Sequence, residues 1–88
     1  MLFVIDFYSS GFDFRKMRSE EDINSLIELG AKIRSIRLKR GYNQTEFANI
    51  IGKDQPSLNR LENGKINPGY LYLKTVANAL GINVSDLC

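Results

Sequence analysis

The chain has 88 residues, a length that allows one small domain with a single core. Twelve basic residues against ten acidic ones give a net charge of +2, too small by itself to indicate nucleic-acid binding. There is no His and the one Cys is Cys88, which excludes a disulfide framework, a Cys/His zinc site and His-based catalysis. We therefore expect a cytoplasmic protein that is not an enzyme, with no cofactor or metal. No apolar run is long enough to span a membrane.

The first segment has the composition of β-strands. LFVIDFY (residues 2–8) and FDFRKM (residues 12–17) are rich in aromatic and branched side chains, with Ser-Ser-Gly between them. We expect a β-hairpin or strand arm within residues 1–25, ahead of a helical domain over residues 26–88. A lone hairpin is marginal in water. The arm could pair with a second copy, cover its own domain, or be a leader before an alternative start at Met17. We favour dimerisation, because pairing removes exposed strand edges.

A helical period begins at Ser19, which can cap a helix whose first turn is acidic. The apolar residues that follow at helical spacing are Ile23, Leu26, Ile27, Leu29, Ile33 and Ile36. They fit one long helix ending at Gly41, or two pieces that meet near Gly30. Five bases and no acid lie between residues 32 and 40, which indicates either a solvated helix face or a nucleic-acid contact.

Short helices follow, each with its own start and stop signals. Asn43 can cap a helix that Gly52 ends, and Asp54 can cap the next one, with Pro56 in its first turn. The expected elements are helices over residues 44–51, 55–62 and 70–80, and a last turn that Ser85 caps.

The first two of these short helices have the spacing of a helix-turn-helix. Ala48 lies four residues after Gln44, where a small side chain lets the next helix approach, and Gly52 falls four further on, at the turn. Leu58 and Leu61 are expected to anchor the second helix to the core. Almost every other residue of GKDQPSLNRLENGK (residues 52–65) is polar, and a helix needed only for packing would not require them.

Three strings, NQTEFA, SLNRLENGK and ANALGINVSDL, are close to those of lambdoid phage repressors. The chain from Leu29 to Leu87 resembles the Cro/repressor helix-turn-helix family of phage and bacterial regulators, also called the XRE family. The resemblance implies an all-α, lambda-repressor-like bundle of four to five short helices.

The same resemblance implies roles by position. The helix from Gln55 to Glu62 would be the recognition helix in the major groove of DNA. The implied base contacts are Gln55, Pro56, Asn59 and Arg60. The implied phosphate contacts are Asn43, Gln44, Lys53, Ser57, Asn63 and Lys65. Pro56 departs from the polar residue more usual in the family, so the target sequence is hard to infer.

Arg37 allows two interpretations. As part of the basic run it would contact DNA, yet it lies next to Ile36 and four residues after Ile33, close to the apolar stripe. In members of the family an Arg at this place pairs with a Glu at the position of Glu62. We therefore predict an internal ion pair between Arg37 and Glu62, with a DNA contact as the alternative.

The resemblance implies sequence-specific binding of double-stranded DNA by a prokaryotic or phage regulator, a repressor that acts as a homodimer on an inverted repeat. One alternative is an antitoxin that represses its own operon and also binds a toxin partner. The other is a protein-interaction module that kept the fold and lost DNA binding. Polar residues at Gln44, Gln55, Arg60 and Asn63 argue against this last alternative.

Overall fold

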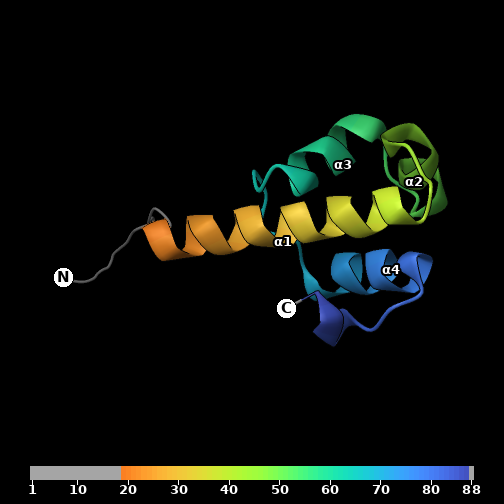
Figure 1. Cartoon of the computed structure of the whole chain (residues 1–88). Coiled ribbons are helices and arrows are strands. Elements are labelled where there is room, and N and C mark those ends of the chain that lie inside the picture. The colour runs from red at the N-terminus through yellow and green to blue at the C-terminus, as the bar shows by residue number, and fades with distance from the viewer. Residues whose placement is uncertain (1–18, 88) are drawn as a thin grey trace.

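The computed structural model describes residues 19–87, and all regular structure in that range is helical. The elements are α1 (Glu20–Lys39), α2 (Gln44–Ile50), α3 (Gln55–Glu62), α4 (Tyr70–Leu80) and the 3₁₀ turn η1 (Val84–Asp86), shown in Figure 1. This confirms the predicted all-α fold and its sequence of helices. The predicted N-terminal hairpin lies outside the described residues. None of the described helices is both long and apolar enough to cross a membrane.

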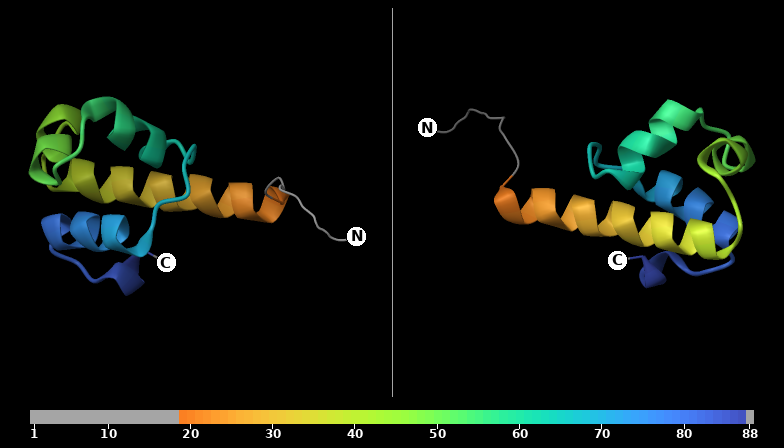
Figure 2. Two further views of the ribbon diagram at one scale, coloured as in Figure 1. Left: turned by 180° about the vertical axis from the view of Figure 1, so that it is seen from behind. Right: turned by 45° about the horizontal axis from the view of Figure 1, so that its top comes forward.

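The long helix α1 lies in the middle of the bundle. It packs against α3 on one side and against α4 on the other, and α2 lies beside α3 (Figures 1 and 2). The N-terminal turns of α1 extend past the other helices (Figure 1). These turns include residues 20–25, so the last part of the predicted 1–25 arm is the start of the same helix.

α1 is one continuous helix, which decides between the two arrangements that its sequence allowed. Ser19 caps its start, where the side-chain oxygen accepts a hydrogen bond from the Asp22 backbone N–H at 3.1 Å. Gly30 does not break the helix. It is buried where α3 crosses, and a Cβ at this position would overlap the backbone carbonyl oxygens of Leu61 and Glu62. Gly30 therefore permits the close approach of α1 and α3.

The apolar stripe of α1 is buried only in its second half. Ile33 is fully buried, whereas Ile23 and Ile27 keep 42% and 48% of their surface exposed. The reason is geometric: the bundle covers the C-terminal half of α1 and leaves its first turns uncovered (Figure 1). Hydrophobic periodicity alone therefore overestimated the length of the buried face.

The caps predicted for α2 and α3 are present. The Asn43 side chain accepts from the Glu46 N–H at 2.8 Å, and the Glu46 carboxylate accepts from the Asn43 N–H at 3.0 Å, which completes a capping box. Asp54 accepts from the Ser57 N–H at 2.8 Å. Gly52 lies between the two helices with a φ of 75°, in the left-handed region that glycine adopts without strain. Local sequence thus fixes where both helices of the motif begin.

The last turn corrects one prediction. Its N-cap residue is Asn83 rather than Ser85, and the Asp86 carboxylate accepts a hydrogen bond from the Asn83 backbone N–H at 3.1 Å. Asn and Ser are both good cap residues. The choice between them depends on where the chain leaves α4, which the sequence pattern did not show.

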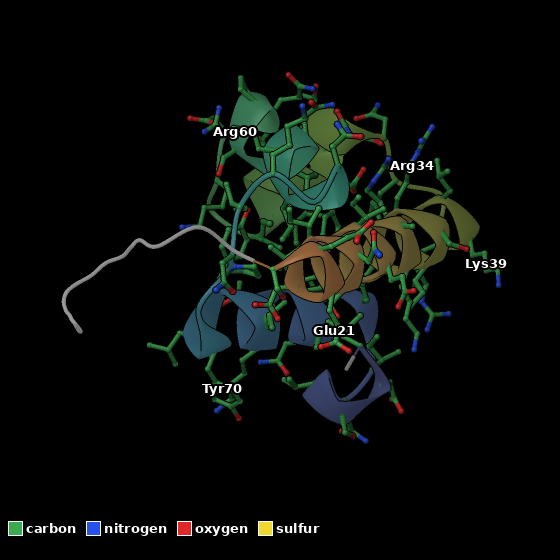
Figure 3. The ribbon with its side chains drawn as sticks, turned by 90° about the vertical axis from the view of Figure 1, so that its left-hand side faces the viewer. Glu21, Arg34, Lys39, Arg60 and Tyr70 are labelled. Atoms are coloured by element: carbon green, nitrogen blue, oxygen red, sulfur yellow. The ribbon has the colours of Figure 1, made fainter. Side chains whose placement is uncertain are left out.

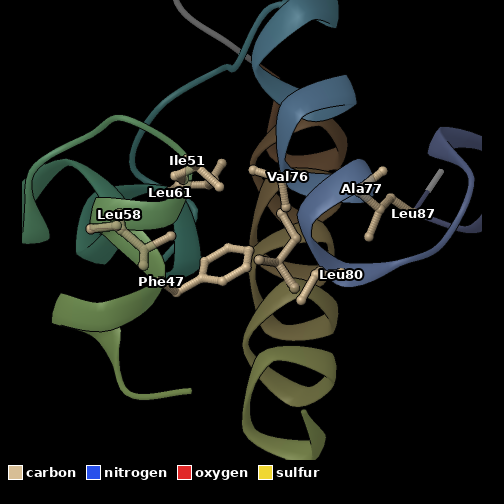
Figure 4. Packing of buried hydrophobic residues seen from close by; sticks show 10 residues of the cluster. Phe47, Ile51, Leu58, Leu61, Val76, Ala77, Leu80 and Leu87 are labelled. Atoms are coloured by element: carbon tan, nitrogen blue, oxygen red, sulfur yellow. The ribbon is translucent and has the colours of Figure 1, made fainter. Parts of the chain in front are cut away.

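One hydrophobic core holds the helices together. Phe47, Leu58 and Leu61 from α2 and α3 face Val76 and Leu80 of α4 across the interior (Figure 4). The full set of buried hydrophobic residues is Ile33, Phe47, Ala48, Ile51, Leu58, Leu61, Val76, Ala77, Leu80 and Leu87. Burying one large aliphatic or aromatic side chain contributes about 1.5–3 kcal/mol. This core fixes α3 with one face turned inward and the other toward solvent.

Candidate nucleic-acid interface

α3 has two distinct faces. Leu58, Leu61 and Glu62 are buried against the rest of the bundle. The exposed residues of α3 and its C-cap are Pro56, Asn59, Arg60 and Asn63, while Gln55 and Ser57 are half-buried. The outward face is therefore polar apart from the Pro56 ring, and it is short enough that few side chains could meet a ligand there.

The predicted ion pair between Arg37 and Glu62 is present behind this face. Arg37 Nε lies 2.7 Å from Glu62 Oε2, and Arg37 Nη2 donates to Oε1 at 3.0 Å. A third donor, Nη1, reaches the carbonyl oxygen of Tyr42 at 2.7 Å. The Arg37 and Glu62 side chains are only 4% and 2% exposed, so Arg37 joins α1 to the end of α3 from inside the protein. Fork-shaped pairing of this kind fixes orientation as well as distance.

Gln44, the first residue of α2, extends the ion pair to the outer face of α3. Its Nε2 donates to Glu62 Oε1 at 2.9 Å. Its Oε1 accepts from Gln55 Nε2 at 2.6 Å and from Asn59 Nδ2 at 3.4 Å. The amide of Gln55 is thus held at the start of α3, and its second N–H and its oxygen remain able to bond outward.

Asn59 is held from both sides. Besides its contact with Gln44, it accepts two hydrogen bonds from Asn63 Nδ2, at its backbone oxygen (2.9 Å) and at Oδ1 (3.1 Å). Arg60 differs, because no hydrogen bond from its guanidinium is found among residues 19–87. It lies beside α3, away from Tyr70 and Glu21 (Figure 3). Of the predicted base-contacting residues, Arg60 therefore has the longest unrestrained side chain.

The predicted phosphate contacts fall into two pairs and two single residues. Asn43 and Gln44 form the start of α2, and Asn63 and Lys65 follow the end of α3. Ser57 lies in the first turn of α3, where its backbone N–H is bonded to Asp54. Lys53 is the outlier: its ammonium lies 4.6 Å from the centre of the Tyr72 ring on α4, a cation–π distance.

Sequence reasoning missed the internal role of Gln44, which was considered only as a phosphate contact. One signal was available: Gln44 and Gln55 hold the same place, the first residue, in the two helices of the motif. Long amides at these two places can meet across the turn, but only the relative tilt of the helices decides whether they do.

A family model described as "Helix-turn-helix" matches residues 33–87, a range that contains α2, α3, α4 and the ion pair. The chain belongs to the Cro/repressor (XRE) family of helix-turn-helix regulators. It is a DNA-binding transcriptional regulator and not an enzyme. The family resemblance found in the sequence is thereby confirmed.

Solved structures of regulators have the same fold. The clp gene regulator ClgR from Corynebacterium glutamicum is 32% identical over 72% of this chain and 81% of that one, with a TM-score of 0.69. The restriction-modification controller protein C.AhdI from Aeromonas hydrophila is 25% identical over 78% of this chain and 100% of that one, with a TM-score of 0.73. A hypothetical transcription factor, NHTF from Neisseria, is 25% identical over 82% and 79% of the two chains, with a TM-score of 0.67.

Proposed function

We propose that the protein is a cytoplasmic repressor that binds an inverted repeat in duplex DNA as a homodimer. The observation that carries this proposal is the division of α3. Its inner face is fixed by Leu58, Leu61 and the pair of Glu62 with Arg37, while its outer face keeps polar side chains for a ligand. A rigid helix with a free polar face fits the major groove, which admits an α-helix.

In this proposal the N-terminal half of α3 reads base edges. Gln55 would pair with adenine through its amide, and Arg60 would pair with guanine through its fork of N–H groups. The ring of Pro56, exposed in the first turn, suits a thymine methyl group. Asn59 would read a base with its second N–H and the remaining lone pair of Oδ1, since its bonds to Gln44 and Asn63 use one site on each atom.

Phosphate contacts on either side would fix the register of α3 in the groove. Asn43 and Gln44 would present the start of α2 to one stretch of backbone, since unpaired N–H groups at a helix start attract anions. Asn63 and Lys65 would contact the backbone at the other end of α3, and Ser57 would add a contact at its start. Lys53 would add another by exchanging the Tyr72 ring for a phosphate. Such contacts position the protein and carry no sequence information.

Selection of binding sites from a random duplex library tests the proposal. A two-fold symmetric dimer predicts an enriched palindrome whose half-sites are one helical turn, about 34 Å, apart. Binding should weaken steeply as salt is raised. Recovery of no preferred sequence, with an affinity that salt does not change, would contradict DNA reading by α3. A single enriched half-site would contradict only the dimer.

The dimer itself is proposed to depend on residues 1–16, which lie outside the described residues. Their strand-like composition is the support, because pairing between copies would satisfy strand edges. Removal of residues 1–16 should convert the dimer to a monomer when mass is measured in solution, and should leave helix content intact. A dimer of unchanged stability would contradict this role.

A further inference from the structure

The five bases between residues 32 and 40 of α1 do not share one environment. Arg37 is bound to Glu62, and Arg40 Nε donates to the Leu80 carbonyl oxygen at 2.9 Å. Lys32 lines an apolar groove with Leu29 and Leu87, beside the C-terminal turn. The five basic residues are close together in the sequence, but they lie on several sides of α1.

Arg34 lines a polar cleft between α1, α2 and α3. The residues that form this cleft are Arg34, Arg37, Gln44, Asn59, Glu62 and Asn63. The one carboxylate in this cleft is already engaged, because Glu62 accepts hydrogen bonds from Arg37 and Gln44 on its two oxygens. The positive charge of Arg34 is therefore not neutralised by any other group that lines the cleft.

The Arg34 guanidinium also lacks a partner on its own helix. The residues three and four positions away, where a helical ion pair would form, are Gly30, Ala31, Arg37 and Leu38. Within residues 19–87 it makes neither an ion pair nor a hydrogen bond. In Figure 3 Arg34 and Arg60 both lie toward α3 from α1, on opposite flanks of α3.

We infer that Arg34 binds a backbone phosphate of the operator duplex at this cleft, where Gln44 keeps one amide N–H that is not bonded to Glu62. The inference rests on the proposed function, in which α3 enters the major groove. A phosphodiester fits this chemistry because it has one negative charge and oxygen acceptors, and a guanidinium matches it with two parallel N–H bonds. The DNA footprint then extends from the helix-turn-helix onto α1.

Two variants on α1 test the inference. Arg34→Gln and Lys32→Ala each remove one exposed positive charge, and the two residues project about 200° apart around the helix. Affinity for the selected duplex is measured from about 50 to 200 mM salt for each variant and for the unchanged protein. Arg34→Gln should lower the slope of log affinity against log salt by about 0.9, the loss of one phosphate contact. The ratio of parent affinity to variant affinity would then be about 3.5-fold larger at about 50 mM salt than at about 200 mM salt. Lys32→Ala should keep the parent slope.

An unchanged slope for Arg34→Gln would overturn the inference, because the Arg34 charge would then make no phosphate contact. An equal loss for both variants would also overturn it, because the general positive charge of α1 and not a contact would then be responsible. These results leave the proposed function standing, provided that the parent protein binds its selected site. Failure of the parent protein to bind any duplex overturns both. Arg34→Lys adds a second readout: it should keep most of the salt slope, since the charge remains, and should lose affinity because the fork is gone. Parent affinity in Arg34→Lys would contradict two-bond recognition.

Discussion

The polar residues on the inner side of α3 and those on its outer side come from the same short stretch of sequence but have different tasks. On the inner side, Glu62 is bound to Arg37 and Gln44 and is almost completely buried. On the outer side, Arg60 and Lys65 are exposed to solvent. A polar helix face is thus not a binding site as a whole. Its inner part holds the helix at the correct angle, and its outer part is available for DNA.

Substitutions on the two sides of α3 should affect two different properties of the protein. Removing one partner of a buried pair leaves an uncompensated charge, which strongly destabilises the fold. Exposed polar side chains contribute little to folding. Inner substitutions should therefore change stability, and outer ones should change DNA binding while the fold remains.

The largest effect is expected for Arg37→Ala. It leaves Glu62 buried without its partner and should reduce the free energy of unfolding by about 3–5 kcal/mol. Urea unfolding followed by circular dichroism measures this loss. Lys39→Ala, which removes an exposed base two residues along α1, is the matched control and should change stability little. Unfolding of Arg37→Ala at the parent midpoint, together with weaker DNA binding, would place Arg37 on the outer side.

The second-largest loss of stability is expected for Gly30→Ala. In most helices this change is stabilising, but here the new Cβ would overlap the Leu61 and Glu62 carbonyl oxygens and push α3 away from α1. Overpacking of this kind costs about 1–3 kcal/mol. Thermal unfolding of Gly30→Ala is compared with that of Ala31→Gly, at an exposed neighbouring position. A Gly30→Ala protein more stable than the parent would show that the approach of the two helices is not tight.

Arg60→Ala should act on binding alone. Loss of a bidentate contact with guanine should reduce discrimination at one base pair of each half-site by about 1–3 kcal/mol, with the melting temperature unchanged. Competition between duplexes that differ only at that base pair measures the effect. Weaker binding to every duplex by the same factor, with discrimination unchanged, would show that Arg60 contacts phosphate and not a base.

Lys65→Ala should have the smallest effect. It removes an exposed phosphate contact, so all duplexes should weaken by the same factor and the salt slope should fall by about 0.9. Titration of selected and unrelated duplexes over a range of salt concentrations checks this. A change in sequence preference would mean that Lys65 takes part in reading bases.

Much of the fold could be predicted because its signals are local. Caps at Ser19, Asn43 and Asp54 define helix starts through side chains that bond within three residues. The pairing of Arg37 with Glu62 spans 25 positions in the sequence, and it was predicted only because the chain resembles a known family.

Other features depend on tertiary arrangement and were not predictable. Gln44 meets Gln55 and Asn59 only because α2 and α3 cross at a particular angle. Ile23 and Ile27 have the spacing of core residues, yet the bundle leaves 42% and 48% of their surface exposed. A pattern along one helix does not show where its neighbours stop.

The most direct test of the account is amide ¹H–¹⁵N correlation spectroscopy during titration with the selected duplex. The account predicts the largest shifts at the start of α2 and over residues 55–60 of α3, with the Arg37 Nε–H signal still hydrogen-bonded to Glu62 in the complex. Small shifts are expected along α4. Shifts centred on α4 or on the first turns of α1, with α3 unchanged, would contradict the claim that the outer face of α3 binds DNA.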